Sequence, residues 1–212
     1  ETDYRFSDGR GLSAEVDFMT PRLTDDLDVF SRPVAYVTIL VSGAKEWSVS
    51  ASITGAWATN DDKAQMEWAT NTVAGVRDVS VGRMDQLPFS ARGDRKRANW
   101  GRVHLSVPVR EGAVVRYLIA YDSGKSVRFF GRELVDWWAR NGKSFDAMLT
   151  EAIGDASALS AKCRTFDNRF RSEMLRVGGE KYADIAELAW RQSFAACKFV
   201  AGPDGEPFMF SA

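Results

Sequence analysis

The C-terminal part of the chain carries the polar side chains that are best placed to do chemistry. Glu180 and Asp204 both lie in or beside turn sequences, "GGEK" and "GPDGEP". A carboxylate at such a position could activate a water molecule or protonate a leaving group, as hydrolytic enzymes require. Each also has a simpler interpretation. An acidic residue at a helix start complements the helix dipole, and an Asp before Gly is first of all a turn residue.

Three residues that follow Glu180 are candidates for substrate binding. Tyr182 offers a hydroxyl group, Arg191 suits a carboxylate ligand, and Gln192 places an amide on an otherwise apolar helix face. The alternatives are packing for Tyr182, an i,i+4 ion pair with Glu187 for Arg191, and a hydrogen-bonded buried amide for Gln192. Both sets of interpretations stay open.

Metal, cofactor and thiol chemistry are not indicated. The sequence contains one histidine, His104, and two cysteines, Cys163 and Cys197, which we expect inside helices as buried thiols. The acidic stretch "TDDLD" lacks the spacing of an EF-hand loop, so a solvated turn is the better interpretation. We therefore predict no metal site and no cofactor.

The overall composition excludes two classes of partner. The 212 residues include 28 Lys and Arg against 29 Asp and Glu, which leaves no basic excess for binding nucleic acid. No run of residues approaches the roughly 18 apolar positions that a membrane span needs. We therefore expect neither nucleic acid nor a membrane span among the partners.

The first part of the chain, residues 1–130, has the period-two pattern of strands. In "WSVSASI" and "RVHLSVPV", apolar residues alternate with polar ones, while "VAYVTILV" and "VVRYLIAY" are nearly continuous apolar runs. Turn signals such as "VSGAKE" and "REGA" separate these segments. The pattern predicts an antiparallel β-sandwich or barrel.

The second part, residues 131–212, has the pattern of helices. We expect a short helix at 132–142, then one long helix from Ser144, or two with a break near Gly154, ending at Gly178-Gly179. A last helix follows and ends before "GPDGEP". We expect its polar stripe to consist of Asp184, Glu187, Arg191 and Lys198. We expect its core face to consist of Ile185, Ala189, Gln192 and Ala196. Helices so apolar need further helices to cover them.

Five segments, in order along the chain, resemble the fungal and bacterial glutaminase A family. They are "FMTPRLTDDLDVFSRPVAYVTI", "GAWATNDDKAQMEW", "NWGRVHLSVP", "IAYDSGKSVRFFGRELVDWWARNG" and "GGEKYADIAELAWRQSFAACKFVAGPDGEPFMFS". The resemblance implies an N-terminal β-sandwich-like region and a C-terminal α/α toroid of the six-hairpin glycosidase-like kind. It also implies export, to the periplasm or outside the cell, and hydrolysis of L-glutamine to L-glutamate and ammonia.

On this resemblance, residues 1–130 correspond to the sandwich-like domain, lacking its N-terminal part, and residues 131–212 to the first helices of the toroid. The remainder of the same protein, or a second chain, would then complete the toroid. Two alternatives stay open: a glycoside hydrolase-like enzyme that acts on a glycan, with Trp137, Trp138 and Trp190 as stacking candidates, and a non-catalytic binding module.

Overall fold

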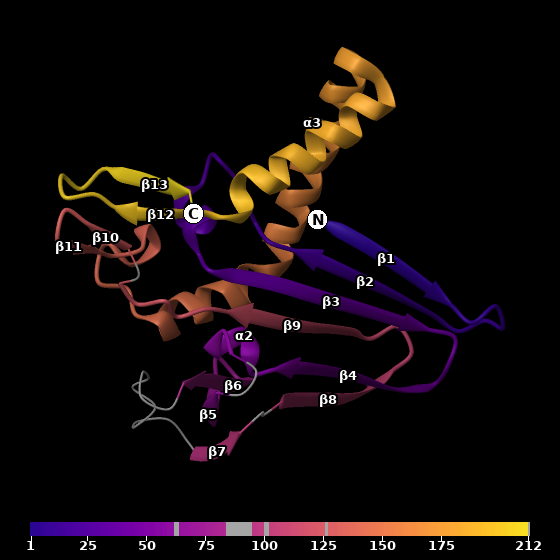
Figure 1. Cartoon of the computed structure of the whole chain (residues 1–212). Helices are drawn as coiled ribbons and strands as arrows, with labels where there is room; N and C mark the ends of the chain where they lie inside the picture. The colour runs from indigo at the N-terminus through magenta and orange to yellow at the C-terminus, as the bar shows by residue number, and fades with distance from the viewer. Residues whose placement is uncertain (62–63, 84–94, 100–101, 126, 212) are drawn as a thin grey trace. The chain divides into compact units, whose positions relative to one another are not determined.

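The computed structural model describes residues 1–61, 64–83, 95–99, 102–125 and 127–211, with side chains omitted at 95–99 (Figure 1). Strands dominate the first part of the chain: β1 (Thr2–Ser7), β2 (Ser13–Met19), β3 (Val34–Ser42), β4 (Glu46–Thr54), β5 (Gln65–Val73), β6 (Val76–Arg83), β7 (Arg95–Asn99), β8 (Arg102–Arg110) and β9 (Val114–Ala120). The short helices α1 (Leu27–Ser31) and α2 (Ala56–Thr59) lie among them.

The remaining elements are β10 (Val127–Phe129), β11 (Arg132–Leu134), the 3-10 helix η2 (Trp137–Ala139), the long helix α3 (Phe145–Ala195), β12 (Cys197–Ala201) and β13 (Pro207–Ser211). The strand pairs whose registers are defined, β4–β8, β5–β6, β5–β7, β10–β11 and β12–β13, are all antiparallel. A further sheet has the order β1-β2-β3-β9. The chain is thus a mixed α and β protein with antiparallel sheets. No helix of the described part combines the length and apolar character needed to cross a membrane, as expected from the sequence.

Two compact units are defined by contacts along the chain. One contains Glu1–Asp3, Asp17–Val37 and Tyr117–Ala212, and the other contains Tyr4–Val16 and Thr38–Arg116. Neither unit begins or ends at residue 130. The domain boundary expected there stays a prediction.

In the second unit, the alternating pattern read from the sequence matches the β4–β8 register. Trp47 lies opposite Val109, Ala51 opposite Leu105, and Ser50 opposite Ser106. The serines share the other face, where the Ser50 hydroxyl lies 3.1 Å from that of Ser106. Apolar residues therefore meet apolar residues across the pair, because both strands have the same period of two.

In the first unit, α3 is a helical hairpin that turns at glycine. Gly179 has φ 74° and ψ −171°, a combination open essentially to glycine alone, and α3 folds back on itself at this point (Figure 1). A Cβ atom on Gly178 would lie 2.5 Å from Cγ of Tyr182, so this position also requires glycine. Of the two alternatives expected from Ser144 onward, the single helix is confirmed, because α3 continues through Gly154, and the stop predicted at Gly178-Gly179 is confirmed as well.

The two halves of α3 pack through aromatic rings. Trp190 lies 5.3 Å from Phe166, 5.4 Å from Phe170 and 4.8 Å from Phe194, measured between ring centroids. Phe194 in turn meets the buried Phe30 of α1 at 5.2 Å. This aromatic row fixes the second half of the hairpin onto the first.

Three polar contacts, one of them buried, join the α1 and β3 segments to α3 in the same unit. The Arg32 guanidinium, at the end of α1, donates to Glu151 Oε2 at 2.8 Å and to Asp155 Oδ2 at 2.9 Å, both on α3. The Tyr36 hydroxyl, on β3, donates to the carbonyl of Ala152 at 3.0 Å. These bonds join segments more than a hundred residues apart in the chain.

Two predicted helical segments need correction. Residues 132–142 form β11 and η2 instead of a helix. The last helix ends at Ala195, and Cys197 and Lys198 lie in β12. The reason is tertiary: β12 pairs with β13 through five residues, and Val200 forms a further bridge with Asp136. Cys163 is in a helix and buried as expected, whereas Cys197 is only half-buried.

Candidate functional site

The structure places Glu180 in an ion cluster rather than in a cleft. Its carboxylate accepts a bond of 2.8 Å from Arg171, which also bonds Asp184 at 3.1 Å and Glu187 at 3.0 Å. These four side chains link the two halves of α3 on its solvent side. The carboxylates draw the pKa of Arg171 upward, with Glu187 as the main cause. Glu180 thus has a structural partner beside the hairpin turn.

Arg191 does not form the ion pair with Glu187 that its spacing predicts. Instead, its guanidinium donates to the backbone carbonyl of Glu1 at 2.6 Å. The i,i+4 interpretation is therefore wrong, because Arg171 from the other half of α3 already holds Glu187.

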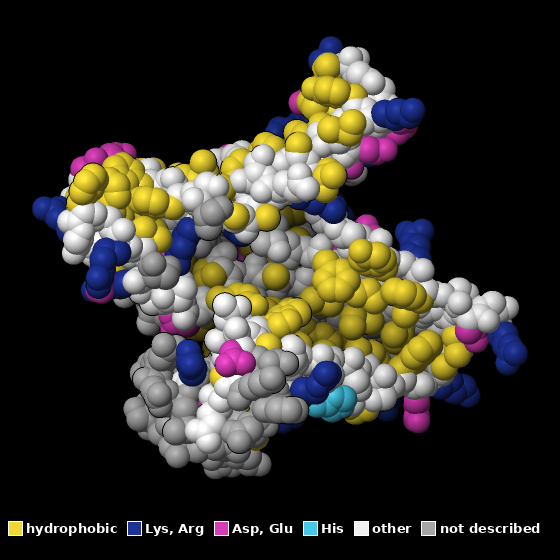
Figure 2. All heavy atoms as spheres, in the orientation of Figure 1, with side chains coloured by type: hydrophobic (Ala, Val, Ile, Leu, Met, Phe, Trp, Pro, Cys, Tyr) yellow, Lys and Arg dark blue, Asp and Glu magenta, His cyan; other side chains and the backbone are white. Residues whose placement is uncertain are grey.

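Tyr182 lies on an open apolar face of α3. It lines a groove of about 490 Å³. The other lining residues are Ile185, Ala186, Ala189, Trp190, Ser193 and Phe194. Ile185 is 67% exposed, and hydrophobic side chains are visible along this part of α3 in Figure 2. The groove is apolar, so it suits another polypeptide surface better than a charged amino acid.

Gln192 is exposed, as are Ile185, Ala189 and Ala196. Their assignment to a core face, and the buried-amide interpretation of Gln192, are thus not met within the described residues and stay predictions for a completed toroid. Phe166 and Phe170 contact the Trp190 ring but do not cover these exposed side chains.

Asp204 occupies the turn between β12 and β13. Its Oδ1 atom accepts a bond of 3.2 Å from the backbone nitrogen of Glu206, which is the turn role expected of an Asp in "GPDGEP". This turn and the glycine turn of α3 lie at opposite ends of the unit (Figure 1). Glu180 and Asp204 therefore do not form a catalytic carboxylate pair in this chain.

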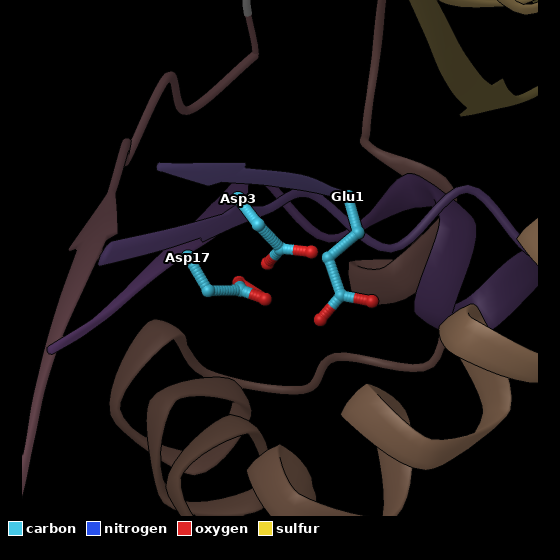
Figure 3. A group of neighbouring side chains, drawn as sticks. All are labelled: Glu1, Asp3 and Asp17. Atoms are coloured by element: carbon cyan, nitrogen blue, oxygen red, sulfur yellow. The ribbon is translucent and has the colours of Figure 1, made fainter. Parts of the chain in front are cut away.

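A cluster that the sequence did not reveal joins Glu1, Asp3 and Asp17. Their carboxylate oxygens lie within 4.8 Å of one another and point toward a common centre (Figure 3). Arg164 of α3 lies beside them, with Nε 3.1 Å from Glu1 Oε1 and Nη2 3.6 Å from Asp17 Oδ2. Three acids suit a hard cation, but here a guanidinium already supplies positive charge. The cluster depends on β1 and β2 being neighbours, which the residue pattern alone does not show.

Within the cluster, the pKa values of Asp17 and Glu1 are shifted in opposite directions. Burial, then the hydrogen bond and charge of Glu1, raise the pKa of Asp17 to about 7. Burial would also raise the pKa of Glu1, but its bonds with Asp17 and Arg164 outweigh burial and lower it. A protonated Asp17 thus shares its proton with an ionised Glu1, as carboxyl dyads do. Because the Glu1 side chain is only 6% exposed, we assign this pair to pH-dependent stability.

Replacing Asp17 with Asn should flatten the dependence of stability on pH. The pKa of Asp17 rises from 3.8 to about 7 on folding, so the folded state binds more protons between these values. The free energy of unfolding should therefore fall as pH rises from about 4 to about 7. D17N should lose this slope in urea unfolding measured across that range, because the amide imitates the protonated acid. The exposed Glu15 of the same strand gives the control, E15Q, which should keep the slope; an unchanged slope in D17N would refute the assignment.

Ser123, Asp136 and Lys198 form a second polar group. A serine beside a lysine could be a nucleophile, but these side chains bond one another. Lys198 Nζ lies 2.6 Å from Ser123 Oγ and 3.0 Å from Oδ1 of the buried Asp136. Asp136 Oδ2 accepts from Ser123 Oγ and from Trp138 Nε1, each at 3.3 Å. The Lys198 ammonium is thus the ion-pair partner of the Asp136 carboxylate, and Ser123 bonds both of them. The group therefore fastens β12 to the segment before β10.

The tryptophans take part in packing. Trp138 is buried, and Trp190 lies among phenylalanines. The Trp137 ring lies 4.0 Å from the guanidinium of Arg140, which covers it. None of the three is presented as a free stacking platform for a sugar.

The sequence is similar to one described family of proteins. The model of a domain of unknown function, DUF5127, matches residues 1–117. No curated protein matches the chain.

Proposed function

The chain belongs to the DUF5127 family, and from that membership and the five similar segments we propose that it is part of an exported glutaminase-like amidohydrolase. The reaction is hydrolysis of the side-chain amide of L-glutamine to L-glutamate and ammonia. The proposed architecture is a β-sandwich-like region followed by the first helices of an α/α toroid.

The ordered segments are the observation that carries this proposal. Three of them, at 18–39, 55–68 and 99–108, fall within the matched residues 1–117, and the other two lie beyond them. The resemblance therefore reaches from the β-rich part through α3 to the β12–β13 hairpin. Agreement of separate segments in order is much less frequent by chance than a single short motif.

The open face of α3 supports the toroid. A helix pair with an exposed apolar face, in which Leu188 is 55% and Tyr182 46% exposed, needs further helices to remove that surface from water. We propose that the remainder of the same protein, or a second chain, supplies them.

Amide hydrolysis needs an activated water or nucleophile, a proton donor for ammonia, and donors to the oxyanion. In the described part of the chain, the carboxylate of Glu180 is already paired with Arg171, and that of Asp136 with Lys198. We therefore propose that the catalytic groups face the toroid interior from helices outside residues 1–212, with L-glutamine as the small-molecule substrate.

The test is ammonia release by the complete protein. Incubation with L-glutamine should yield ammonia and glutamate in equal amounts, and D-glutamine and L-asparagine serve as matched substrate controls. Release of sugar from aryl glycosides without ammonia would replace this proposal by the glycoside hydrolase alternative. Inactivity toward both substrate classes, with binding to a polymer, would leave a non-catalytic module.

A further inference from the structure

Strand β1 lies at an open edge of its sheet. The sheet has the order β1-β2-β3-β9, so among the described residues β1 pairs on one side only (Figure 1). A strand in this position presents a row of backbone N–H and C=O groups to which another strand can bond. Its sequence, "TDYRFS", contains neither Pro nor Lys, two residues that often block such an edge. The edge is therefore able to accept a further strand.

The backbone groups of Asp3 and Arg5 face this edge. Asp8, directly after β1, donates its backbone N–H to the carbonyl of Leu12, directly before β2, so the bonding side of Asp8 is toward β2. Bonding sides alternate along an antiparallel strand. Asp3 and Arg5 lie at odd distances from Asp8, and their N–H and C=O groups therefore point away from β2.

The side chains of β1 form a charged face and an aromatic face. Asp3 and Arg5 share one face, because successive side chains of a strand alternate. Tyr4 and Phe6 share the other face and are 51% and 58% exposed. Their rings are stacked, with 6.4 Å between centroids and 20° between planes. Exposed apolar side chains beside an open strand edge indicate an interaction surface.

The charges of β1 are complementary to those of a second copy of β1. When two copies of the strand run antiparallel about a two-fold axis at Tyr4, Asp3 of each copy lies opposite Arg5 of the other. The symmetry therefore forms this ion pair twice. A shift of two residues in either direction places Asp3 opposite Asp3 or Arg5 opposite Arg5, and like charges directly opposite each other are destabilising. Charge thus selects one register.

Both charged side chains are accessible for this pairing. In the described part of the chain, Arg5 pairs with Glu15 of β2 at 3.3 Å, and these side chains are 81% and 53% exposed. Ion pairs as exposed as this one are weak. Asp3 is exposed, and its carboxylate lies within 4.8 Å of those of Glu1 and Asp17. A cation supplied by a second copy would reduce the repulsion among these acids.

We propose that the protein forms a two-fold symmetric dimer through β1, which joins the sheets of the two copies edge to edge. The backbone and the side chain of Asp3 bond those of Arg5 of the second copy, and the reverse. On the other face, Tyr4 lies opposite Tyr4 of the second copy and diagonal to its Phe6, where aromatic side chains are within reach of each other. This dimer does not depend on the proposed reaction.

The experiment mixes two charge-reversed variants. Asp3→Arg places two arginines opposite each other across the dimer, and Arg5→Asp places two aspartates there. Each variant alone should therefore raise the dimer dissociation constant about tenfold or more. An equimolar mixture of D3R and R5D should recover the dimer, because opposite charges face each other again. Sedimentation velocity over a range of protein concentrations measures the association.

Mixing separates the interface from damage within one chain, which a second variant cannot repair. A mixture as monomeric as its two components would rule out the proposed pairing. Glu15→Gln is the matched control, because it removes the internal ion-pair partner of Arg5 and leaves β1 unchanged. E15Q should dimerise as the wild type does, and loss of its dimer would mean that the internal pair is responsible.

Hydrogen exchange locates the contact without any substitution. The amides of Asp3 and Arg5 should gain protection as the concentration of the wild-type protein rises. A dimer without this gain would be joined elsewhere. Protection that is independent of concentration would mean that a strand of the same protein covers the edge. Either result contradicts the proposal, as does a wild-type protein that stays monomeric.

Discussion

Replacing Gly179 with valine should destabilise the first unit by about 3 kcal/mol, the upper end for a strained backbone position. The φ of 74° and ψ of −171° at Gly179 place the backbone where a Cβ atom clashes, and a β-branched residue suffers most. Relief of that strain requires residue 179 to become helical. The second half of α3 would then point away from the first and separate Trp190 from Phe166 and Phe170.

Gly154 provides the matched control for this result. It lies inside the first half of α3 with ordinary helical backbone, and a Cβ atom there would meet no neighbour within 4 Å. Gly154→Ala should therefore stabilise the protein by about 0.5–1 kcal/mol. Urea unfolding followed by Trp fluorescence measures both variants. Equal and small effects for G179V and G154A would show that the hairpin does not depend on its glycine.

Replacing Arg32 with alanine should cost about 2–4 kcal/mol of unfolding free energy. The Arg32 side chain is only 9% exposed, and it bonds Glu151 and Asp155 at once. Its removal takes the shared cation from Glu151 and Asp155, although Lys143 still pairs with Glu151 at 2.8 Å. Because these carboxylates are about half exposed, water recovers part of the loss, and we place the effect below that of a fully buried pair.

A surface pair of the same type tests the role of burial in this prediction. Arg128 and Glu133 lie 3.4 Å apart with side chains 72% and 50% exposed. Exposed ion pairs contribute roughly 0–1 kcal/mol, so Glu133→Ala should change stability little. Arg32→Lys should fall between R32A and wild type, because an ammonium lacks the planar fork that reaches both acids. Similar losses for R32A and E133A would contradict this account.

Features that repeat over a short stretch could be predicted from the sequence. The alternation in "WSVSASI" identified the face of β4 that carries Trp47 and Val49, and the glycine pair identified the turn of α3. Both depend on local chemistry: the period of a strand and the backbone freedom of glycine. Neighbouring residues are enough to specify them.

Features that depend on distant partners could not be predicted. "CKFV" continues a helical pattern, and it becomes a strand because β13 and Val135 offer it backbone partners. The acidic cluster needs Asp17 beside Glu1, and the ion pairs of Arg32 span more than a hundred residues. Local pattern contains no information on which strand lies next to which. The structure joins the five candidate residues, Glu180, Tyr182, Arg191, Gln192 and Asp204, to no common site.

The helical hairpin is attached to the rest of its unit at its base and along its lower part, where Arg164 and Asp167 bond Glu1. Ser144 caps its start, Phe145 touches Trp138 of η2, and β12 beyond its other end bridges back to Asp136. The two halves of α3 extend from this base to the bend at Gly179. Matched insertions of whole turns on either side of Gly179 would lengthen the arm without disturbing its attachment. Arm length is thus a quantity that evolution, or an engineer grafting a reporter at the bend, could vary independently of the rest of the molecule.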